Sequence, residues 1–368
     1  MNTPVPNPVA GRKIRLLVVD DSPTVRMLVT RSLVDDPDIE VVAGAADPYE
    51  ARDRILELQP DVMTLDLEMP RMDGLTFLRI LMQKRPMPVV VMSSLTQKGS
   101  ELALEALQCG AVDVLAKPYG SNSTALLGRQ LAERVKMAVG CRVRLPGQAG
   151  PAPRIGSSDA PAVIKNRLHP KQIILLGAST GGTEALREVL IRLPSNCPPI
   201  AIVQHIPAGF SRAFAERMNK TCKMEVREAV HGDTLRTGLA LIAPGDYHMT
   251  LRWAGAHYEV GLRQGPPVWH QRPAVDILFK SAVEAAGHHA VVGLLTGMGR
   301  DGADGMLKLR EAGAFTVAQD EATCVVYGMP KAAVELGAAA KIAPLLQIPH
   351  LLAQALAEPA SAPERVTR

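Results

Sequence analysis

Two groups of chemically reactive residues follow each other along this chain. The first group lies at the ends of apolar segments and consists of Asp20, Asp21, Asp66, Ser93 and Lys117. The second group lies in three motifs: GASTGG (177–182), QHIP (204–207) and TGMGRDGADG (296–305). Clustered carboxylates can hold a divalent cation beside an aspartate that accepts a phosphoryl group, and a serine, a histidine and an aspartate can together transfer an acyl group. The pairing predicts a hydrolase that phosphorylation controls.

Length and composition indicate two globular α/β domains. The chain has 368 residues, of which 47% are apolar and only 3% aromatic. Such a length predicts two domains with a core each, and an aliphatic composition suits parallel sheets covered by helices. The net charge is +4, and residues 141–170 carry that excess, with five basic residues against one acidic residue. No basic face with aromatic stacking residues is present, so we expect no nucleic-acid partner.

The cysteines and the apolar runs indicate a cytoplasmic protein that is not inserted in a membrane. The five cysteines have no paired spacing and no C-x-x-C motif, which predicts reduced thiols. The first residues, MNTPVPNPVAGRK, lack the apolar segment of a signal peptide, and no apolar run approaches 18 residues.

The first 139 residues alternate between short apolar runs and helical patterns. The runs predict strands at 14–19, 39–45, 61–65, 88–92 and 112–115. Apolar residues at three- and four-residue spacing predict helices at 24–33, 48–58, 75–84, 100–108 and 124–139. Five strands with five helices predict a doubly wound, five-stranded parallel sheet.

The rest of the chain contains a linker, a second α/β domain and a tail. Residues 140–169 are rich in proline, glycine and arginine without periodicity, which predicts a linker. Alternation resumes over 170–358, with strands predicted at 171–178, 199–204, 290–295 and 315–319, and helices at 183–193, 211–219, 274–286 and 303–312. Between 224 and 261 the strands are shorter, which predicts an antiparallel excursion from a mostly parallel sheet. We expect 359–368 to be a flexible tail.

Three carboxylate side chains of the first domain lie just after predicted strands. Since the carboxyl ends of parallel strands meet at one edge of the sheet, Asp20, Asp21 and Asp66 should lie together there. Mg²⁺ prefers such oxygen ligands. Asp66 could then attack a phosphoryl group, while the metal and Lys117 neutralise the added charge and Ser93 donates a hydrogen bond to the phosphoryl oxygens.

The second domain offers a serine, a choice of histidines and an aspartate at strand ends. Ser179 lies between glycines, after a strand and before a helix, where a sharp turn exposes its hydroxyl. The general base must lie at the same sheet edge, and His205 directly follows a strand, whereas His270 in a loop is a second choice. Asp301 follows a third strand and could orient the histidine. The glycine-rich turn 296–299 could supply backbone N–H groups to an oxyanion.

The whole chain resembles a known family. The stretch PDVMTLDLEMPRMDG (60–74) is similar to the phosphoacceptor region of response-regulator receiver domains. GASTGG, QHIP, IAPGDYHM (242–249), TGMGRDGADG and CVVYGMP (324–330) resemble the chemotaxis protein-glutamate methylesterase/deamidase family, CheB. The resemblance implies that Ser179 is the nucleophile, His205 the base and Asp301 its orienting acid. It also implies a Met298 amide donor, Thr180 beside the site, and Asp66 as phosphoacceptor.

The resemblance further implies hydrolysis of glutamate γ-methyl esters on chemoreceptors and deamidation of certain receptor glutamines. The phosphodonor would be a chemotaxis histidine kinase, with Mg²⁺ in the receiver and no cofactor in the catalytic domain. Two alternatives stand beside this hypothesis. The second domain could dock partners without catalysis, or it could be an esterase or peptidase for another substrate.

Overall fold

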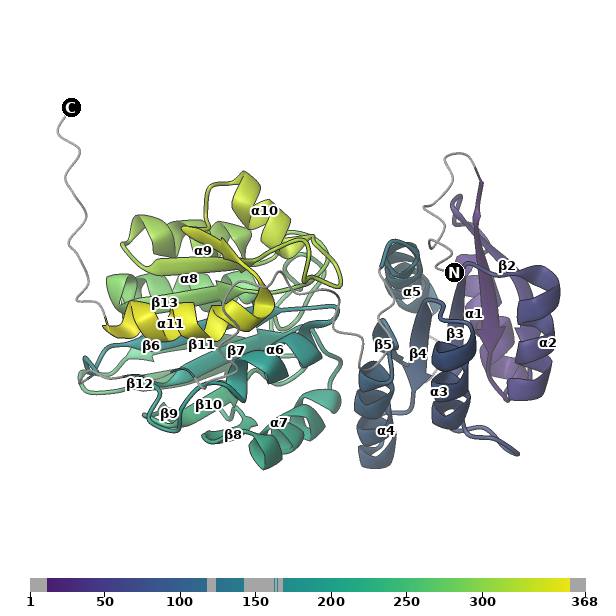
Figure 1. Cartoon of the computed structure of the whole chain (residues 1–368), viewed down its shortest axis with the longest axis horizontal. Helices are drawn as coiled ribbons and strands as arrows, with labels where there is room; N and C mark the ends of the chain where they lie inside the picture. The colour runs from purple at the N-terminus through teal and green to yellow at the C-terminus, as the bar shows by residue number, and fades with distance from the viewer. Residues whose placement is uncertain (1–11, 118–123, 142–161, 163, 165–167, 358–368) are drawn as a thin grey trace. The chain divides into compact units, whose positions relative to one another are not determined.

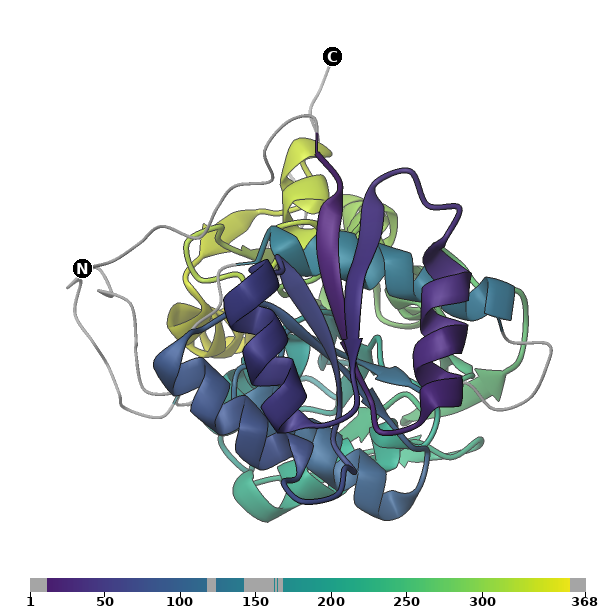
Figure 2. The same ribbon diagram turned by 90° about the vertical axis from the view of Figure 1, so that its right-hand side faces the viewer.

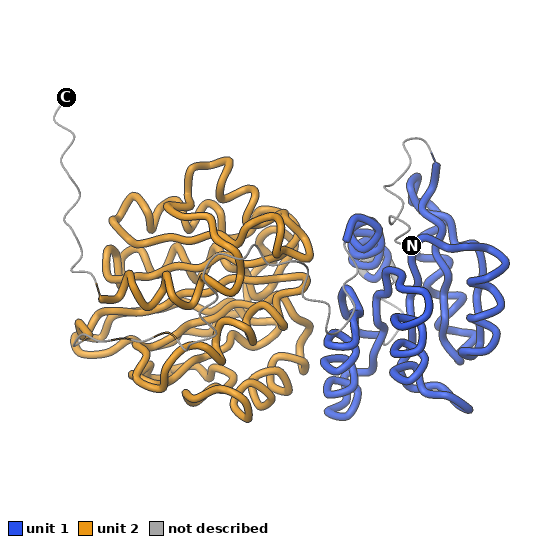
Figure 3. Tube along the Cα trace, in the orientation of Figure 1, with its two compact units in different colours: residues 1–152 blue, residues 153–368 orange. Residues whose placement is uncertain are grey.

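The computed structural model describes residues 12–117, 124–141, 162, 164 and 168–357. The chain divides into two compact units, residues 1–152 and 153–368 (Figure 3). Each unit has its own sheet and its own core, and each is described by itself below. Most of the predicted linker, 140–169, and the predicted tail, 359–368, lie outside the described residues.

The first unit is a five-stranded parallel sheet with the strand order β2-β1-β3-β4-β5. Its strands are β1 (Ile14–Val19), β2 (Ile39–Ala45), β3 (Val62–Asp66), β4 (Val89–Ser93) and β5 (Asp113–Ala116). Its helices are α1 (Pro23–Leu33), α2 (Pro48–Leu58), α3 (Gly74–Lys84), α4 (Gln97–Gln108) and α5 (Thr124–Val139). Helices cover both faces of the sheet (Figure 2). The doubly wound receiver-type fold predicted from the sequence is confirmed.

Capping side chains determine where four helices of this unit begin. Ser22, Asp47, Asp73 and Thr96 each accept a hydrogen bond from a backbone N–H in the first turn of α1, α2, α3 and α4. Such caps satisfy donors that have no partner within the helix. The cap at Thr96 explains why α4 begins three residues before the predicted helix, since periodicity alone did not mark this polar first turn.

The second unit contains a seven-stranded parallel sheet with the order β15-β14-β13-β6-β7-β10-β8 (Figure 1). Its strands are β6 (Ile173–Ala178), β7 (Ile200–Gln204), β8 (Glu225–Glu228), β10 (Leu239–Ile242), β13 (Ala290–Leu294), β14 (Phe315–Gln319) and β15 (Lys341–Ala343). Its α-helices are α6 (Gly182–Leu190), α7 (Phe210–Thr221), α8 (Val275–Ala285), α9 (Ala303–Glu311), α10 (Met329–Glu335) and α11 (Ile348–Ala357). The mostly parallel α/β architecture is confirmed.

The antiparallel excursion is smaller than the range 224–261 suggested. A separate three-stranded antiparallel sheet has the order β11-β12-β9 and consists of β9 (Thr234–Leu235), β11 (His248–Trp253) and β12 (Tyr258–Arg263). However, β8 and β10 pair in parallel and extend the main sheet. All four residues of β10 are buried, so this strand is favoured in the sheet interior, whereas the sequence of a four-residue strand carries no signal for pairing direction.

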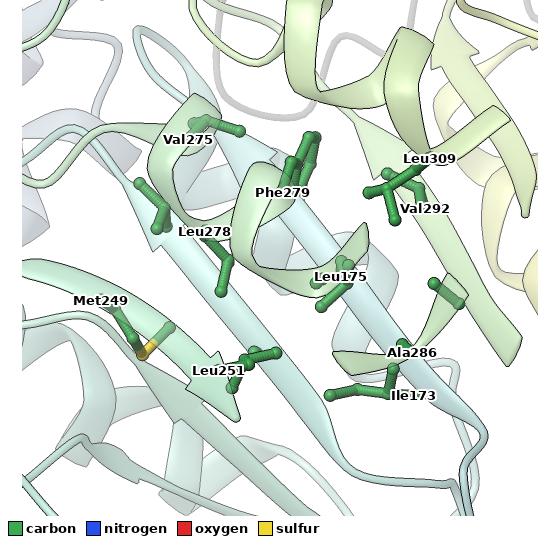
Figure 4. Packing of buried hydrophobic residues seen from close by; sticks show 14 of the residues in the cluster. Ile173, Leu175, Met249, Leu251, Val275, Leu278, Phe279, Ala286, Val292 and Leu309 are labelled. Carbon is green, nitrogen blue, oxygen red and sulfur yellow. The ribbon is translucent and has the colours of Figure 1, made fainter. Parts of the chain in front are cut away.

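Helix α8 connects the two sheets of this unit through a shared core. Val275, Leu278 and Phe279 of α8 are fully buried. Figure 4 shows them between Leu175 and Val292 of the main sheet and Met249 and Leu251 of β11. Burial of side chains of this size contributes about 1.5–3 kcal/mol each, so the position of α8 relative to the strand ends is firmly fixed.

Part of the predicted linker is anchored on the second unit. Ala162 is 1% exposed and Ile164 is 7% exposed, and the Ala162 amide donates to the carbonyl of Arg192 at 2.9 Å. Residues 162 and 164 therefore pack with the second unit, ahead of residue 170, where the sequence predicts its start.

Three of the five cysteines are buried. All five cysteines are free, and burial raises the pKa of Cys141 and Cys197 to about 12. Within the described part of the chain, no helix combines the length and apolar character needed to cross a membrane.

Candidate functional site

Three neighbouring strands place the predicted catalytic residues at one edge of the main sheet. Strand β6 lies between β7 and β13, and all three strands run in parallel. Ser179 follows β6, His205 follows β7 and Asp301 lies beyond the end of β13. The backbone ties these ends together, since the Ser179 amide donates to Thr296 O and the His205 amide donates to Ala178 O, each at 3.0 Å.

Glycines make the serine turn sterically accessible. Gly181 has a φ of +73°, which side chains other than glycine rarely adopt, and it directly precedes α6. Gly297 has no room for a side chain, because a Cβ there would lie 2.6 Å from Ser179 Cβ and 2.5 Å from Met329 Sδ. The turn 296–299 can therefore run directly against the loop of Ser179, which itself remains partly exposed at Ser179.

His205 and Asp301 form a buried hydrogen-bonded pair. The distance between His205 Nε2 and Asp301 Oδ2 is 2.8 Å, and the two side chains are only 3% and 2% exposed. The ring orientation is reversed relative to the familiar serine-protease triad, in which Nδ1 contacts the aspartate. Here Nδ1 is buried and has no hydrogen-bond partner in the described part of the chain. Because a carboxylate accepts hydrogen bonds, the tautomer with the ring proton on Nε2 fits this contact, and it leaves the lone pair on Nδ1.

Asp301 also accepts two backbone hydrogen bonds from the first turn of α8. The amide of Val275 donates to Oδ2 at 2.7 Å, and the amide of Asp276 donates to Oδ1 at 2.8 Å. Both donors have no partner within a helix, and the helix N-terminus favours a negative charge. The carboxylate is therefore fixed by three donors, and it in turn fixes the imidazole of His205.

The remaining residues predicted for this site differ from one another in burial and in hydrogen bonding. Thr180 is buried, and its carbonyl accepts a hydrogen bond from Thr296 Oγ1 at 3.0 Å. Met298 is 43% exposed beside the serine turn, and its amide makes no hydrogen bond within the described residues. His270, the second choice for the base, is exposed in the loop before α8, and Asp301 bonds His205 instead. No hydrogen bond joins Ser179 Oγ to His205 within the described residues, and such bonds are often long in ligand-free enzymes.

Two residues of the site were missed by sequence reasoning. Gln204 is 3% exposed, and its Nε2 donates to Ser179 O at 2.8 Å and to His205 O at 3.0 Å. Thr296 Oγ1 donates to Thr180 O and accepts from the amides of Val325 and Val326. Gln204 ends β7 and Thr296 follows β13, and both belong to the quoted motifs. Their position at the ends of buried strands was the available signal for a role there.

The predicted acidic site forms at the carboxyl edge of the first sheet. Ligand atoms of Asp20, Asp21 and Asp66 all lie within 4.8 Å of one another. Lys117 Nζ lies 2.8 Å from Asp66 Oδ2 and 3.0 Å from Asp20 Oδ2. Burial raises the pKa of Asp66 to about 6, although the nearby ammonium of Lys117 opposes this shift.

This donor set fits Mg²⁺. The cluster has three carboxylates, of which the Lys117 ammonium contacts two, and carboxylate oxygens are the ligands that Mg²⁺ takes in proteins. Ser93 lies at the end of β4, next to β3, but its hydroxyl donates to Gly99 O at 2.9 Å. It would have to rotate away from α4 to reach a phosphoryl group on Asp66.

Comparisons with known proteins show the family to which each unit is similar. Residues 16–126 match the response regulator receiver domain family, and residues 174–352 match the CheB methylesterase family. The chain is 53% identical over 333 residues to the protein-glutamate methylesterase/protein-glutamine glutaminase 2 of Syntrophus aciditrophicus, covering 90% of this chain and 95% of that protein. It is 48% identical over 363 residues to the protein-glutamate methylesterase/protein-glutamine glutaminase of Paraburkholderia xenovorans, covering 97% of this chain and 99% of that protein. The resemblance found in the sequence is thus confirmed, and the chain belongs to the CheB family of protein-glutamate methylesterases/protein-glutamine glutaminases, with a receiver domain before its methylesterase domain.

Proposed function

We propose that this enzyme hydrolyses γ-methyl esters of glutamates on chemoreceptors, and deamidates specific receptor glutamines, through a Ser179–His205–Asp301 triad. The reaction would serve chemosensory adaptation in the cytoplasm. Membership of the family supports the reaction class. The observation that carries the assignment of residues is the buried 2.8 Å hydrogen bond between His205 and Asp301 at the sheet edge where the Ser179 turn lies.

The geometry supports the following sequence of steps. His205 Nδ1 removes the proton of Ser179 Oγ as this oxygen attacks the side-chain carbonyl of the substrate. The Met298 amide donates to the developing oxyanion. The protonated His205, held by Asp301, then gives its proton to the leaving methanol or ammonia. Water, activated by the same Nδ1, hydrolyses the acyl-enzyme, releases a glutamate carboxylate and restores the serine.

In the receiver domain, Asp66 would accept the phosphoryl group from a chemotaxis histidine kinase. Asp20, Asp21 and Asp66 would hold Mg²⁺, which when bound offsets the negative charge of the carboxylates and the phosphoryl group. Lys117 already contacts two of these carboxylates. Ser93 would exchange its bond to Gly99 for one to the phosphoryl oxygens.

Phosphorylation would control access to the triad. We expect the unphosphorylated receiver to occlude the catalytic edge and phosphorylation of Asp66 to weaken that docking. A catalytic fragment should then be faster than the unphosphorylated full chain. The fragment should begin near residue 160, because Ala162 and Ile164 pack into the catalytic unit. A fragment that is no faster than the intact enzyme would contradict occlusion and favour a receiver that organises the site.

Methanol release from a methylated receptor fragment, compared with a generic methyl ester, tests the proposed substrate. We expect a clear preference for the receptor fragment, and loss of activity on both in Ser179→Ala. Equal rates on both substrates would favour a general esterase. Release of methanol by Ser179→Ala at a near wild-type rate would refute the nucleophile assignment.

A further inference from the structure

The loop before α8 presents an aromatic side chain in a conformation that is unfavourable for it. Val268 and Gln271 form an antiparallel bridge with hydrogen bonds of 3.0 and 2.9 Å. The two residues between them, Trp269 and His270, have φ angles of +51° and +60°. Two positive φ values in a two-residue turn normally require glycine or asparagine. Strained backbone of this kind concentrates at functional sites.

This turn holds Trp269 at the surface rather than in the core. The side chain is 43% exposed, and its Nε1 donates to Asp276 Oδ2 at 3.0 Å. Asp276 is fully buried, and its other oxygen accepts from the Gly305 amide at 2.8 Å. The indole is therefore anchored at its polar end while part of its ring remains available to a ligand.

The loop is also held at both ends. His248 is 2% exposed, its Nε2 donates to Pro266 O at 3.1 Å, and its Nδ1 accepts from the Ala274 amide at 3.2 Å. Arg272 Nε donates to Asp246 Oδ1 at 2.9 Å. These bonds preorganise the turn, so binding of a ligand there requires little additional ordering.

The guanidinium of Arg300 packs against the indole of Trp269, and Arg300 directly precedes Asp301 in the sequence. The guanidinium carbon of Arg300 lies 5.0 Å from the centre of the indole ring, which is within cation–π distance. Arg300 is 47% exposed and contacts Asp304 through Nη2 at 3.0 Å. Its other nitrogens donate to no group in the described part of the chain. Asp301 follows directly, and its carboxylate bonds the amide of Asp276, the residue that anchors Trp269.

We propose that Trp269 and Arg300 form a specificity element that binds an acidic segment of the substrate next to the reacting glutamate. The chemistry follows from the exposed indole, which can pack against aliphatic parts of a polypeptide, and from the free donors of the guanidinium, which pair well with carboxylates. This inference rests on the proposed triad and on a polypeptide substrate. It assigns the pair to substrate binding and leaves the bond-breaking steps to the triad.

The test uses the full-length enzyme and two synthetic helical peptides, each with one glutamate γ-methyl ester. One peptide carries glutamates three and four residues from the ester, and the other carries alanines there. Methanol release gives KM and kcat for each. We expect the wild type to have a KM about fivefold lower for the glutamate peptide, as one well-placed charge pair near the surface would give. In Arg300→Ala this ratio should fall to about one, with kcat changed less than about twofold, and Arg300→Glu should reverse it.

A second tryptophan–cation pair provides the control. Lys171 Nζ lies 5.2 Å from the ring centre of Trp253, but Lys171 precedes β6 and so lies at the opposite edge of the sheet from Ser179. Lys171→Ala should keep the wild-type ratio of the two KM values. Trp269→Ala should lose most of the preference for the glutamate peptide, and Trp269→Phe should retain part of that preference. An unchanged ratio in Arg300→Ala, or the same loss in Lys171→Ala, would overturn the inference. Failure of the wild type to release methanol from either peptide would instead contradict the proposed function.

Discussion

Replacing Asp301 by asparagine separates its role in catalysis from its role in the fold. The carboxylate accepts from His205 Nε2 and Val275 N at Oδ2, and from Asp276 N at Oδ1. An asparagine has only one accepting oxygen, so one of the two positions must carry an NH₂ group. If the NH₂ occupies the Oδ2 position, it donates to His205 Nε2 and forces the ring proton onto Nδ1. His205 Nδ1 then carries a proton in place of its lone pair, and the ring is in the wrong tautomer to act as a base.

The magnitudes of the two effects differ enough to be told apart. The equivalent change of tautomer in a serine protease lowers kcat about 10,000-fold, which corresponds to roughly 5 kcal/mol of transition-state stabilisation. The fold loses at least one buried hydrogen bond from an amide of α8, which costs about 1–3 kcal/mol. We therefore expect Asp301→Asn to fold, to unfold at a lower temperature than the wild type, and to lose about 1,000- to 10,000-fold in kcat.

Asp320 provides the matched control for this experiment. It follows β14 at the same sheet edge and accepts a hydrogen bond from the Thr323 amide at 3.0 Å, but it does not contact His205. Asp320→Asn should lower thermal stability while methanol release stays near the wild-type rate. If Asp301→Asn retained more than about a tenth of the wild-type kcat, the reasoning from the tautomer would be refuted.

Three further substitutions and one removal test the rest of the assignment. His205→Gln should lose about as much activity as Ser179→Ala, typically several orders of magnitude, whereas His270→Gln should keep most of its methanol release, and the opposite result would transfer the base to His270. Asp66→Asn should not become faster when a small-molecule phosphodonor is added, and activation of this variant would place the phosphoacceptor elsewhere. Chelation of Mg²⁺ should abolish incorporation of radioactive phosphate into the wild type while leaving methanol release by a catalytic fragment unchanged, and loss of activity in the fragment would indicate a metal requirement in the methylesterase domain.

The positions of both sites were predictable because buried parallel strands are visible as short apolar runs. The residue that follows each run is then expected at the carboxyl edge of the sheet, and parallel pairing brings these strand ends together. Asp66 at the end of β3 and His205 after β7 were selected in this way, without knowledge of any side-chain contact. Residues that are far apart in the sequence but follow parallel strands can thus be predicted to lie close together.

The remaining features depend on contacts that leave no periodic signal. Thr296 Oγ1 bonds the carbonyl of Thr180 over a separation of 116 residues, and Trp269 Nε1 bonds a carboxylate on the first turn of α8. The orientation of the His205 ring is set by the position of Asp301, which itself depends on where α8 packs. Parallel pairing of β8 with β10 was missed because a run of four residues gives no information on strand direction.

The carboxylates of the two sites differ in how fully they are paired with hydrogen-bond donors and cations. This difference is relevant to how the receiver site could control the triad. In the receiver, three carboxylates lie together, the ammonium of Lys117 contacts only two of them, and burial raises the pKa of Asp66 to about 6. Such a site responds strongly to a metal ion or a phosphoryl group, because both change its charge balance. In the methylesterase domain, one carboxylate receives three donors and is 2% exposed. A carboxylate so fully paired has little freedom to move. This contrast supports control through access of the substrate to the triad, with the geometry of His205 and Asp301 unchanged by the state of Asp66.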